Sequence, residues 1–365
     1  MNFQLDEIVI EERCRQSTLA ARVISRAPAA VPVNFAADAR DAVRPGMGVA
    51  DPFGAGKRRM IVMHRRAPFL MACPAGSSEF ACCGYLVLVL ASNCPMDCSY
   101  CFLQEYLADN PGFQVYANYT DAFDELERMR RRAAPGRALR VGTGELADSL
   151  AFDWMTGISR ELVEFCASRA SLLLELKTKT DEIDNLLTVD PRGRTLVSWT
   201  LSPPAVFLSS EKGTASPAAR LAAARRVLEA GYKVGFHLDP VIAYPGAESD
   251  YLALLDDLFD TISPARIAFI SLGGLRMTPA LRSAARRRHP HDPLLCGEEV
   301  IAPDGRYRTF TPLRASLLRA LERRIAAASP AILRYLCMEP PSIHRRVLGH
   351  APAPAAALGA ALAGR

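Results

Sequence analysis

The sequence predicts an α/β fold built on a parallel β-sheet, with N- and C-terminal extensions. The first observation is a continuous apolar run, Gly84-Tyr-Leu-Val-Leu-Val-Leu-Ala91, which has the length and composition of a strand buried on both faces. The second is that strand-like segments then alternate with helical patterns about six times. Such alternation is typical of parallel strands joined by right-handed helical crossovers.

The elements follow in order along the chain. After the first run, strands are expected at Ala138 to Thr143, Leu172 to Leu176, Thr195 to Leu201, Lys233 to Leu238 and Arg266 to Leu272. Helices are expected at Asp121 to Arg132, Trp154 to Ala170, Glu182 to Leu187, Pro217 to Ala230 and Ser249 to Phe259. The helix at Pro217 has the clearest limits, because Ser216 can cap it, proline suits the first position and Gly231 follows its end.

Four regions follow from this pattern. Residues 1–80 read as an N-terminal extension rich in alanine, proline and arginine, and 81–280 hold the regular strand–helix alternation. Residues 281–350 form a helical or mixed region, with helices expected at Pro279 to Arg288 and Pro312 to Ala328 and a short apolar segment at Ile332 to Met338. The tail, 351–365, is nearly all alanine, proline, glycine and leucine, and is expected to be disordered.

Composition excludes several classes of protein. Half of the 365 residues are hydrophobic and 23% are charged, which permits a large core and excludes general disorder. No apolar run approaches the roughly 20 residues of a membrane helix, and the N-terminus has no secretory pattern, so we expect a soluble cytoplasmic protein without a membrane partner. The net charge of +5 includes arginine clusters at 130–132, 286–288 and 345–346, which suit either phosphate contacts or solvated helix faces.

Three of the ten cysteines form the most informative motif, Cys94-Pro-Met-Asp-Cys98-Ser-Tyr-Cys101. Spacings of four and three place three thiolates around one small volume, as an iron–sulfur cluster requires, and leave one iron of a four-iron cluster open. The loop follows the first buried strand, at the end of a parallel sheet where reactive groups gather. The alternative is a zinc site whose fourth ligand is Cys73, Cys82 or Cys83. In its spacing and position the motif resembles the radical S-adenosylmethionine (SAM) superfamily.

That resemblance implies a 4Fe–4S cluster bound by Cys94, Cys98 and Cys101, with SAM on the open iron. Residues at the ends of the following strands then become candidates for SAM binding. They are Gly144 and Glu145 after the second strand, Lys177 or Lys179 after the third, and Thr200 and Ser202 at the end of the fourth. Glu145 is suited to the SAM ammonium group, and a lysine is suited to its carboxylate.

Each assignment has a structural alternative. A glycine turn with a solvated carboxylate explains Gly144 and Glu145, and exposure explains the lysines. At the ends of the fifth and sixth strands, His237 fits either a hydrogen-bonded core residue or a substrate contact, and Arg276 could meet a phosphate or carboxylate.

The order of segments further resembles the spore photoproduct lyase family. The matching pieces are Cys94 to Gln104, Lys177-Thr-Lys-Thr-Asp-Glu-Ile-Asp-Asn-Leu-Leu187, Gly213-Thr-Ala-Ser and Ala230-Gly-Tyr-Lys-Val-Gly-Phe236, within residues 57 to 280. The resemblance implies a partial (β/α)6 barrel of the radical SAM type, a 4Fe–4S cluster, SAM, DNA as a partner, and repair of a thymine photoproduct. Tyr100 and Glu145 are the candidate catalytic residues.

Two departures separate this chain from that pattern. The family returns a hydrogen atom to its product from a cysteine after the second strand, through tyrosines near the cluster. Here Glu145 stands at that position, and a carboxylic O–H bond is too strong for the same role. Tyr100 is kept, but the second tyrosine is Phe102, which has no hydroxyl group.

Three functions therefore stand as hypotheses. The first is a radical SAM enzyme acting on damaged DNA, with a ferredoxin or flavodoxin as electron donor. The second is a radical SAM enzyme acting on a substrate that is not a nucleic acid. The third is a non-catalytic module that binds nucleic acid or is stabilised by zinc, which Glu145 and the lysines at the strand ends disfavour.

Overall fold

A computed structural model describes residues 3–39, 49–66, 68–73, 80, 83–134 and 138–363. Cys82, one alternative zinc ligand, lies outside these residues. Within them, no helix combines the length and the apolar character needed to cross a membrane.

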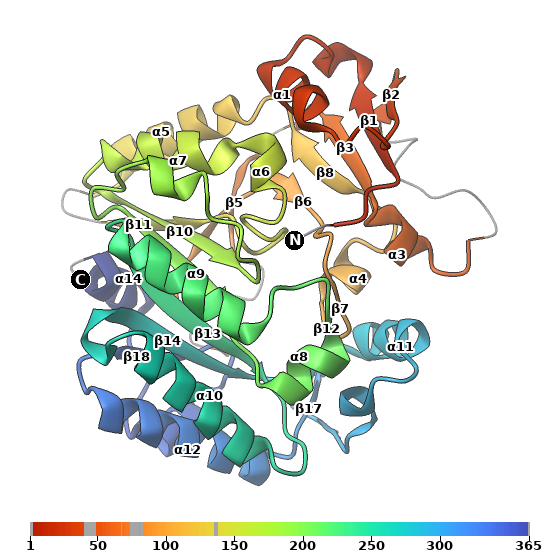
Figure 1. The fold of residues 1–365 in the computed structure, drawn as a ribbon. Helices are drawn as coiled ribbons and strands as arrows, with labels where there is room; N and C mark the ends of the chain where they lie inside the picture. The colour runs from red at the N-terminus through yellow and green to blue at the C-terminus, as the bar shows by residue number, and fades with distance from the viewer. Residues whose placement is uncertain are drawn as a thin grey trace.

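The main sheet curls into a half-barrel, and the predicted α/β fold is confirmed (Figure 1). Its strand order is β18-β14-β13-β11-β10-β9-β5-β4. The bounds are β4 (Leu70–Ala72), β5 (Leu86–Leu88), β9 (Leu139–Gly142), β10 (Leu172–Thr178), β11 (Thr195–Thr200), β13 (Lys233–Val241), β14 (Ile267–Gly274) and β18 (Leu333–Leu336). All neighbours pair in parallel except β4, which is antiparallel to β5. The six predicted strands are present, and the short apolar segment at 332–338 supplies the additional parallel strand β18.

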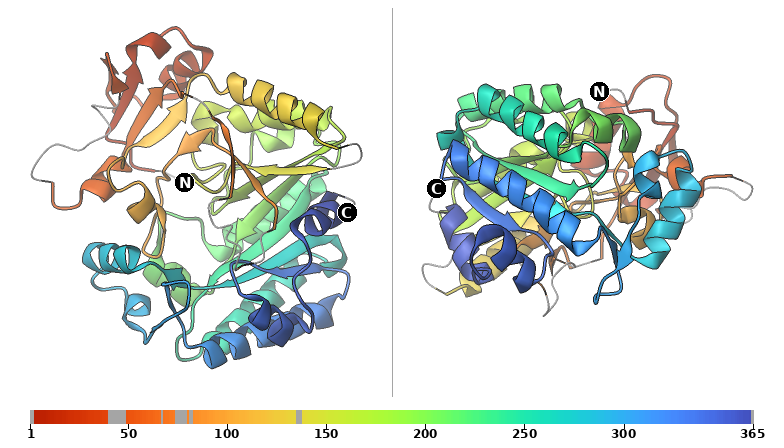
Figure 2. Two further views of the ribbon diagram at one scale, coloured as in Figure 1. Left: turned by 180° about the vertical axis from the view of Figure 1, so that it is seen from behind. Right: turned by 90° about the horizontal axis from the view of Figure 1, so that it is seen from below.

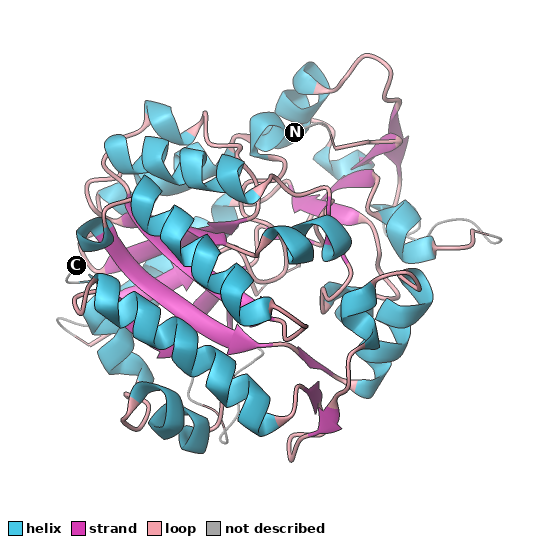
Figure 3. Cartoon of the chain, turned by 60° about the horizontal axis from the view of Figure 1, so that its bottom comes forward, coloured by secondary structure: helices cyan, strands magenta, loops and turns pink. Residues whose placement is uncertain are grey.

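Helices cover the outer face of this sheet (Figure 3). They are α5 (Thr120–Arg132), α6 (Asp153–Thr156), α7 (Ile158–Ala167), α9 (Pro217–Glu229), α10 (Ala247–Thr261), α12 (Thr311–Ala328) and α13 (Pro341–Leu348). The predicted start of α9 is confirmed, because the Ser216 hydroxyl accepts a hydrogen bond from the Ala219 amide at 3.2 Å.

Two helix predictions are wrong. The helix expected at Trp154 to Ala170 is interrupted at Gly157, whose φ of +61° ends α6 before α7 begins. The segment Glu182 to Leu187 is not an α-helix; only a short 3-10 turn, η2 (Leu186–Thr188), forms there. Elsewhere, further 3-10 turns are η1 (Glu12–Cys14), η3 (Pro264–Arg266) and η4 (Pro293–Cys296).

The N-terminal region forms a second sheet, although the sequence predicted only an extension with weak periodicity. Its order is β2-β1-β3-β8-β6, from β1 (Glu7–Glu11), β2 (Val33–Ala36), β3 (Arg59–Met63), β6 (Ala91–Ser92) and β8 (Phe113–Tyr116). Helices α1 (Thr18–Arg26) and α3 (Pro52–Gly56) connect its strands. Because β6 ends at Ser92 and β8 begins at Phe113, this sheet holds both ends of the cysteine segment.

The C-terminal tail is helical rather than disordered. Helix α14 (Ala355–Ala363) lies at one end of the main sheet, on the side away from α11 (Pro279–Arg288) (Figures 1 and 2). Leu362 has no exposed surface and packs with Leu173, Leu196 and Phe269 from three different strands. The alanine-rich composition predicts disorder because it shows no contact that would order the tail. In the structure, packing of the tail against the sheet offsets the conformational entropy that it loses.

Helix α13 carries a buried histidine that makes stability depend on pH. His344 is 2% exposed, and neither ring nitrogen has a hydrogen-bond partner among the described residues. Burial, with a smaller contribution from His350, lowers the pKa of His344 to about 4. The unfolded chain has a histidine pKa of about 6.5. Between about pH 6.5 and about pH 4, His344 is therefore protonated in the unfolded chain but neutral in the folded chain.

Stability should consequently be highest above pH 6.5 and should fall as the pH drops toward 4, by at most about 3 kcal/mol from this residue. His344→Leu should reduce that loss. Urea unfolding of both proteins at pH 7 and pH 5 measures the difference. An equal drop in both proteins would show that His344 is not its source.

Candidate active site

The interior of the half-barrel contains a layer of linked polar side chains midway along the strands. Glu175 on β10 accepts hydrogen bonds from Arg140 Nε at 2.9 Å and Ser198 Oγ at 2.8 Å. His237 lies between Glu175 and Ser271, with its ring nitrogens 3.0 and 2.6 Å from their oxygens. Burial lowers the pKa of His237 to about 4. His237 is therefore a hydrogen-bonded core residue, which is the structural alternative stated above.

The next inward positions, two residues further along each strand, form the layer at the mouth of the half-barrel. These mouth residues, each two positions beyond a polar-layer residue, are Gly142, Lys177, Thr200, Asp239, Gly273 and Cys337. Arg276, on β15 (Arg276–Met277), reaches into this layer and pairs with Asp239 at 2.7 Å. Burial would raise the pKa of Asp239, but Arg276 outweighs it and holds that pKa at about 2.

The cysteine segment is held in place by contacts from three directions. Cys98 lies in β7 (Asp97–Cys98), which pairs antiparallel with β12 (Glu211–Lys212), so that Cys98 is opposite Glu211. The buried ammonium group of Lys57 donates to the carbonyl oxygens of Cys94, at 3.1 Å, and Met96. Gln104, in α4 (Leu103–Tyr106), donates to the Cys101 carbonyl at 3.0 Å.

The three thiols gather in one cluster together with Met96 and Ala151, and none forms a disulfide. Burial raises the pKa of the Cys98 thiol to about 12 and that of Cys94 further. Such thiols keep their protons until a metal displaces them. Among the described residues, no three histidine, cysteine, aspartate or glutamate side chains stand in finished metal-binding geometry. The fit to an iron–sulfur cluster therefore rests on the donor set, three sulfur atoms on one anchored loop.

The other cysteines considered as zinc ligands lie elsewhere. Cys83 packs against the cluster of Leu173 and Phe269 at the opposite end of the barrel from the mouth, and Cys73 packs against the main core.

A buried carboxylate beside the cysteine loop joins three of the predicted site residues. Glu211 accepts hydrogen bonds from Lys179 Nζ at 2.8 Å, from Ser202 Oγ at 2.7 Å and from the Tyr100 hydroxyl. Its second oxygen lies 2.5 Å from Arg220 Nη2. Burial would raise the pKa of Glu211, but the charges of Lys179 and Arg220 hold it well below its usual value. We call these five residues the Glu211 network.

Sequence reasoning missed Glu211 and Arg220. The available signal was Arg220 itself, an arginine on the apolar face of α9 that is fully buried in the structure. An arginine in such a position requires a partner, because uncompensated burial of its charge is costly. Helix α8 (Pro204–Ser210) leads directly to Glu211.

The remaining predicted SAM residues fall in two places. The Thr200 carbonyl accepts from Arg220 Nη1 at 2.8 Å, which ties the end of β11 to the Glu211 network. Glu145 instead lies with Lys177, Asp239 and Arg276, and among the described residues it makes no hydrogen bond to the network. A Cβ atom on Gly144 would be 2.5 Å from Lys177 Cβ, so this glycine makes room for a neighbouring strand.

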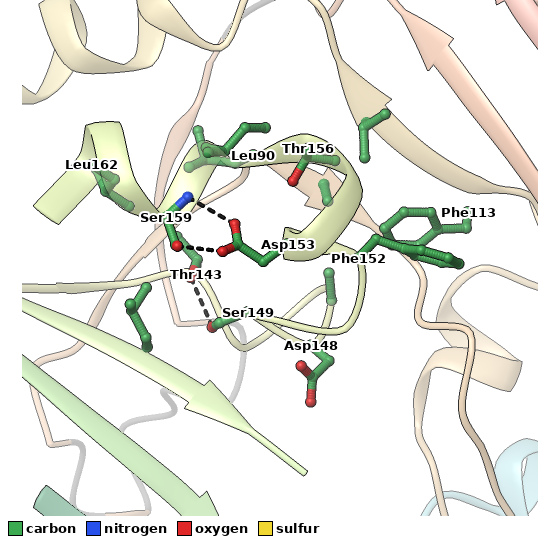
Figure 4. Close-up of a pocket in the computed structure, with 15 residues that line it drawn as sticks. Leu90, Phe113, Thr143, Asp148, Ser149, Phe152, Asp153, Thr156, Ser159 and Leu162 are labelled. Carbon is green, nitrogen blue, oxygen red and sulfur yellow. Dashed lines mark hydrogen bonds between the residues drawn. The ribbon is translucent and has the colours of Figure 1, made fainter. Parts of the chain in front are cut away.

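A small cavity lies on the outer side of the barrel strands, and one residue that lines it, Asp148, is close enough to Cys94 to raise the pKa of that thiol (Figure 4). Its volume is about 40 Å³, and its mostly apolar lining includes Leu90, Phe113, Phe152 and Leu162. Polar groups at its edge already have partners, such as Ser159 N with Asp153 at 2.9 Å. The space suits little more than a water molecule, so it is not the active site.

A basic groove lies on α11. Pro279, Arg282, Ser283, Arg286, Arg287 and Tyr307 line a volume of about 350 Å³, with Tyr307 on β17 (Tyr307–Arg308), which pairs with β16 (Val300–Ile301). Of the predicted cluster at 286–288, Arg288 instead forms ion pairs with Asp51 and Asp97, at 2.9 and 2.8 Å. Arg286 and Arg287 are thus available for an anionic partner, whereas Arg288 anchors the cysteine loop.

Comparisons with known proteins agree with this architecture. Residues 39–307 match the family model described as spore photoproduct lyase. The spore photoproduct lyase of a Geobacillus species is 29% identical over 216 residues, which are 59% of this chain and 61% of that protein. That of Clostridium acetobutylicum is 23% identical over 257 residues, 70% of this chain and 74% of that protein. The first match thus spans less than two thirds of its relative.

Solved structures show the same fold. A spore photoproduct lyase complexed with dinucleoside spore photoproduct has a TM-score of 0.81 and 23% identity, and covers 92% of this chain and 100% of its own. A variant with bound S-adenosylmethionine and dinucleoside spore photoproduct has a TM-score of 0.80 and 22% identity over the same shares.

Proposed function

The chain belongs to the spore photoproduct lyase family, and from this membership we propose that it is a radical SAM enzyme that repairs a thymine photoproduct in DNA. The proposal rests on one observation, that the three thiols lie next to the segment that bears Glu211. The thiols of Cys94, Cys98 and Cys101 lie on an anchored loop whose strand β7 pairs with the segment bearing Glu211. Metal ligands and a polar network thus meet at the carboxyl ends of parallel strands, where such folds place their chemistry.

The three cysteines would hold a 4Fe–4S cluster, and the Glu211 network would hold SAM. When bound, this pair of groups supplies a 5′-deoxyadenosyl radical after one-electron reduction by a ferredoxin or flavodoxin. Lys179 keeps 15% of its side chain exposed while Glu211 anchors it, so its ammonium group can meet the SAM carboxylate. Tyr100 and Ser202 position the same region through Glu211, and the barrel wall excludes water.

The substrate would bind at the mouth layer and along the basic groove. Glu145 and Lys177 present a carboxylate and an amine with no hydrogen bond or ion pair to their side chains among the described residues. Arg286 and Arg287 on α11 are suited to DNA phosphates.

The decisive experiment uses the full chain reconstituted with iron and sulfide without oxygen. With SAM, dithionite and dinucleoside spore photoproduct, we expect both 5′-deoxyadenosine and restored thymidine, measured by chromatography. A colourless protein with stoichiometric zinc and no SAM cleavage would overturn the proposal.

A second candidate is radical SAM chemistry on a substrate that is not a nucleic acid. It is favoured by the charged mouth, where Glu145 stands at the position of the family's cysteine and Asp239 pairs with Arg276. SAM cleavage without any thymidine, from dinucleoside or from irradiated DNA, would favour this candidate over repair.

A further inference from the structure

The mouth layer contains a thiol, Cys337, that sequence reasoning left without a role. Strand β18 pairs with β14 so that Tyr335 lies opposite Ser271 in the polar layer. Cys337 is two residues further along, and its amide continues the ladder by donating to the Leu272 carbonyl at 2.8 Å. Because alternate residues of a strand share a face, Cys337 points to the barrel interior as Tyr335 does. The residue as a whole is only partly buried.

Charged groups surround this sulfur. Arg276 Nη2 is 3.8 Å from Cys337 Sγ, and the same guanidinium is held by Asp239. Lys177 is close enough to affect Cys337 on one side and Glu145 on the other. The thiol, Lys177 and Glu145 therefore face one space. The Lys177 amine and the Glu145 carboxylate form no hydrogen bond or ion pair there with a described residue.

A separate observation also indicates that this space receives a ligand. The Tyr85 hydroxyl is more than nine-tenths buried and forms no hydrogen bond of good geometry with a described residue, although the Gly144 backbone is close enough to affect its pKa. It lies directly beneath Gly142 in the mouth layer, where a Cβ atom would be 1.9 Å from it. Buried hydroxyl groups usually form well-aligned hydrogen bonds, so a hydroxyl beside Glu145 that lacks one points to a bound polar group.

The environment of Cys337 keeps it in the form that hydrogen-atom transfer needs. Burial raises the pKa of the thiol well above its usual value, and Asp239 adds to this effect despite the opposing charge of Arg276. At neutral pH the sulfur therefore retains its hydrogen atom. Glu145 cannot replace it, because a carboxylic O–H bond is too strong to give a hydrogen atom to a carbon radical.

We propose that Cys337 is the hydrogen-atom donor that ends the radical reaction in this chain, from a different strand than the one that carries Glu145. The inference rests on the proposed function. The S–H bond of Cys337 breaks homolytically, a C–H bond forms on the product radical, and a thiyl radical is left. One electron from the ferredoxin or flavodoxin and one proton from solvent restore the thiol. No hydrogen atom returns to 5′-deoxyadenosine, so one SAM is consumed for each product.

The test compares wild type with Cys337→Ser, whose hydroxyl matches the thiol in shape but holds its hydrogen more strongly. In D2O the thiol exchanges, so one of the two thymidines released from each dinucleoside should carry one deuterium, with a 5′-deoxyadenosine to thymidine ratio near one half. Cys337→Ser should cleave SAM at the wild-type rate, while its yield of thymidine falls by about tenfold or more. The exposed cysteine variant Cys296→Ser should match wild type in every measurement.

A second readout needs no cluster. In metal-free protein, peptide mass spectrometry should show slow alkylation of Cys337 by iodoacetamide at pH 7, slowed further by dinucleoside spore photoproduct. Thermal unfolding checks that Cys337→Ser is folded. If wild type cleaves SAM but releases no thymidine, the repair function fails. If wild type and Cys337→Ser both give deuterated thymidine in equal yield, only the assignment of Cys337 fails.

Discussion

Cys98→Ala is expected to leave a folded protein that binds no cluster and forms no 5′-deoxyadenosine. A wild-type protein reconstituted without oxygen should bind about four irons, and three protein sulfur ligands are the fewest that hold such a cluster while leaving one iron open. Cys98 is 7% exposed and lies on the short β7–β12 ladder, whose hydrogen bonds come from the backbone and survive the substitution. Iron content, the visible spectrum and SAM cleavage measure the effect.

The matched control is Cys296→Ala, because Cys296 is an exposed cysteine outside the thiol cluster. Cys94→Ala and Cys101→Ala should behave as Cys98→Ala does. Four irons and full SAM cleavage in any of the three would place the ligands elsewhere.

Among substitutions that leave the backbone and the metal ligands unchanged, Glu211→Gln should lower the stability of the protein most. The change leaves the buried guanidinium of Arg220 and the ammonium group of Lys179 without a counter-charge. Loss of one partner from a buried ion pair typically costs about 3–5 kcal/mol. SAM affinity should fall as well, because Glu211 positions Lys179 and lies opposite Cys98. Urea unfolding and SAM binding measure the two effects.

Two further variants test whether the lost stability comes from leaving a buried charge unpaired. Glu164→Gln removes a half-exposed carboxylate whose ion pair among the described residues is with Arg160 on the surface, and should cost less than about 1 kcal/mol. The double variant Glu211→Gln, Arg220→Met should recover part of the lost stability, since it removes the unpaired charge. A cost for Glu211→Gln no larger than that of Glu164→Gln would show that the network contributes little.

Prediction from sequence succeeded where the signal is local. The six strands were recognised because a strand buried on both faces is a short apolar run, whatever it packs against. The start of α9 was recognised because Ser216 and Pro217 act within one helical turn. The cysteine motif is likewise a matter of spacing within a single loop.

Prediction failed where long-range contacts decide the outcome. The strands of residues 1–80 are not predicted because their pairings, β1 with β2 and with β3, and β3 with β8, join segments that are distant in the chain. Helix α14 is predicted as a disordered tail because its order depends on the packing of Leu362 against residues of distant strands. Glu182 to Leu187 has helical composition, yet the fold leaves only one turn there.

By itself, then, the sequence determined the alternating α/β architecture and the three sulfur donors, because periodicity and spacing act over a few residues. Only the tertiary structure decided which side chains meet. It brought Tyr100, Lys179 and Ser202 to Glu211, and it set Cys337 in the same layer as Lys177, although 160 positions separate their numbers. The physical reason is that a parallel sheet aligns the ends of strands that are distant in the chain, so a site at its mouth is defined by register rather than by neighbouring residues.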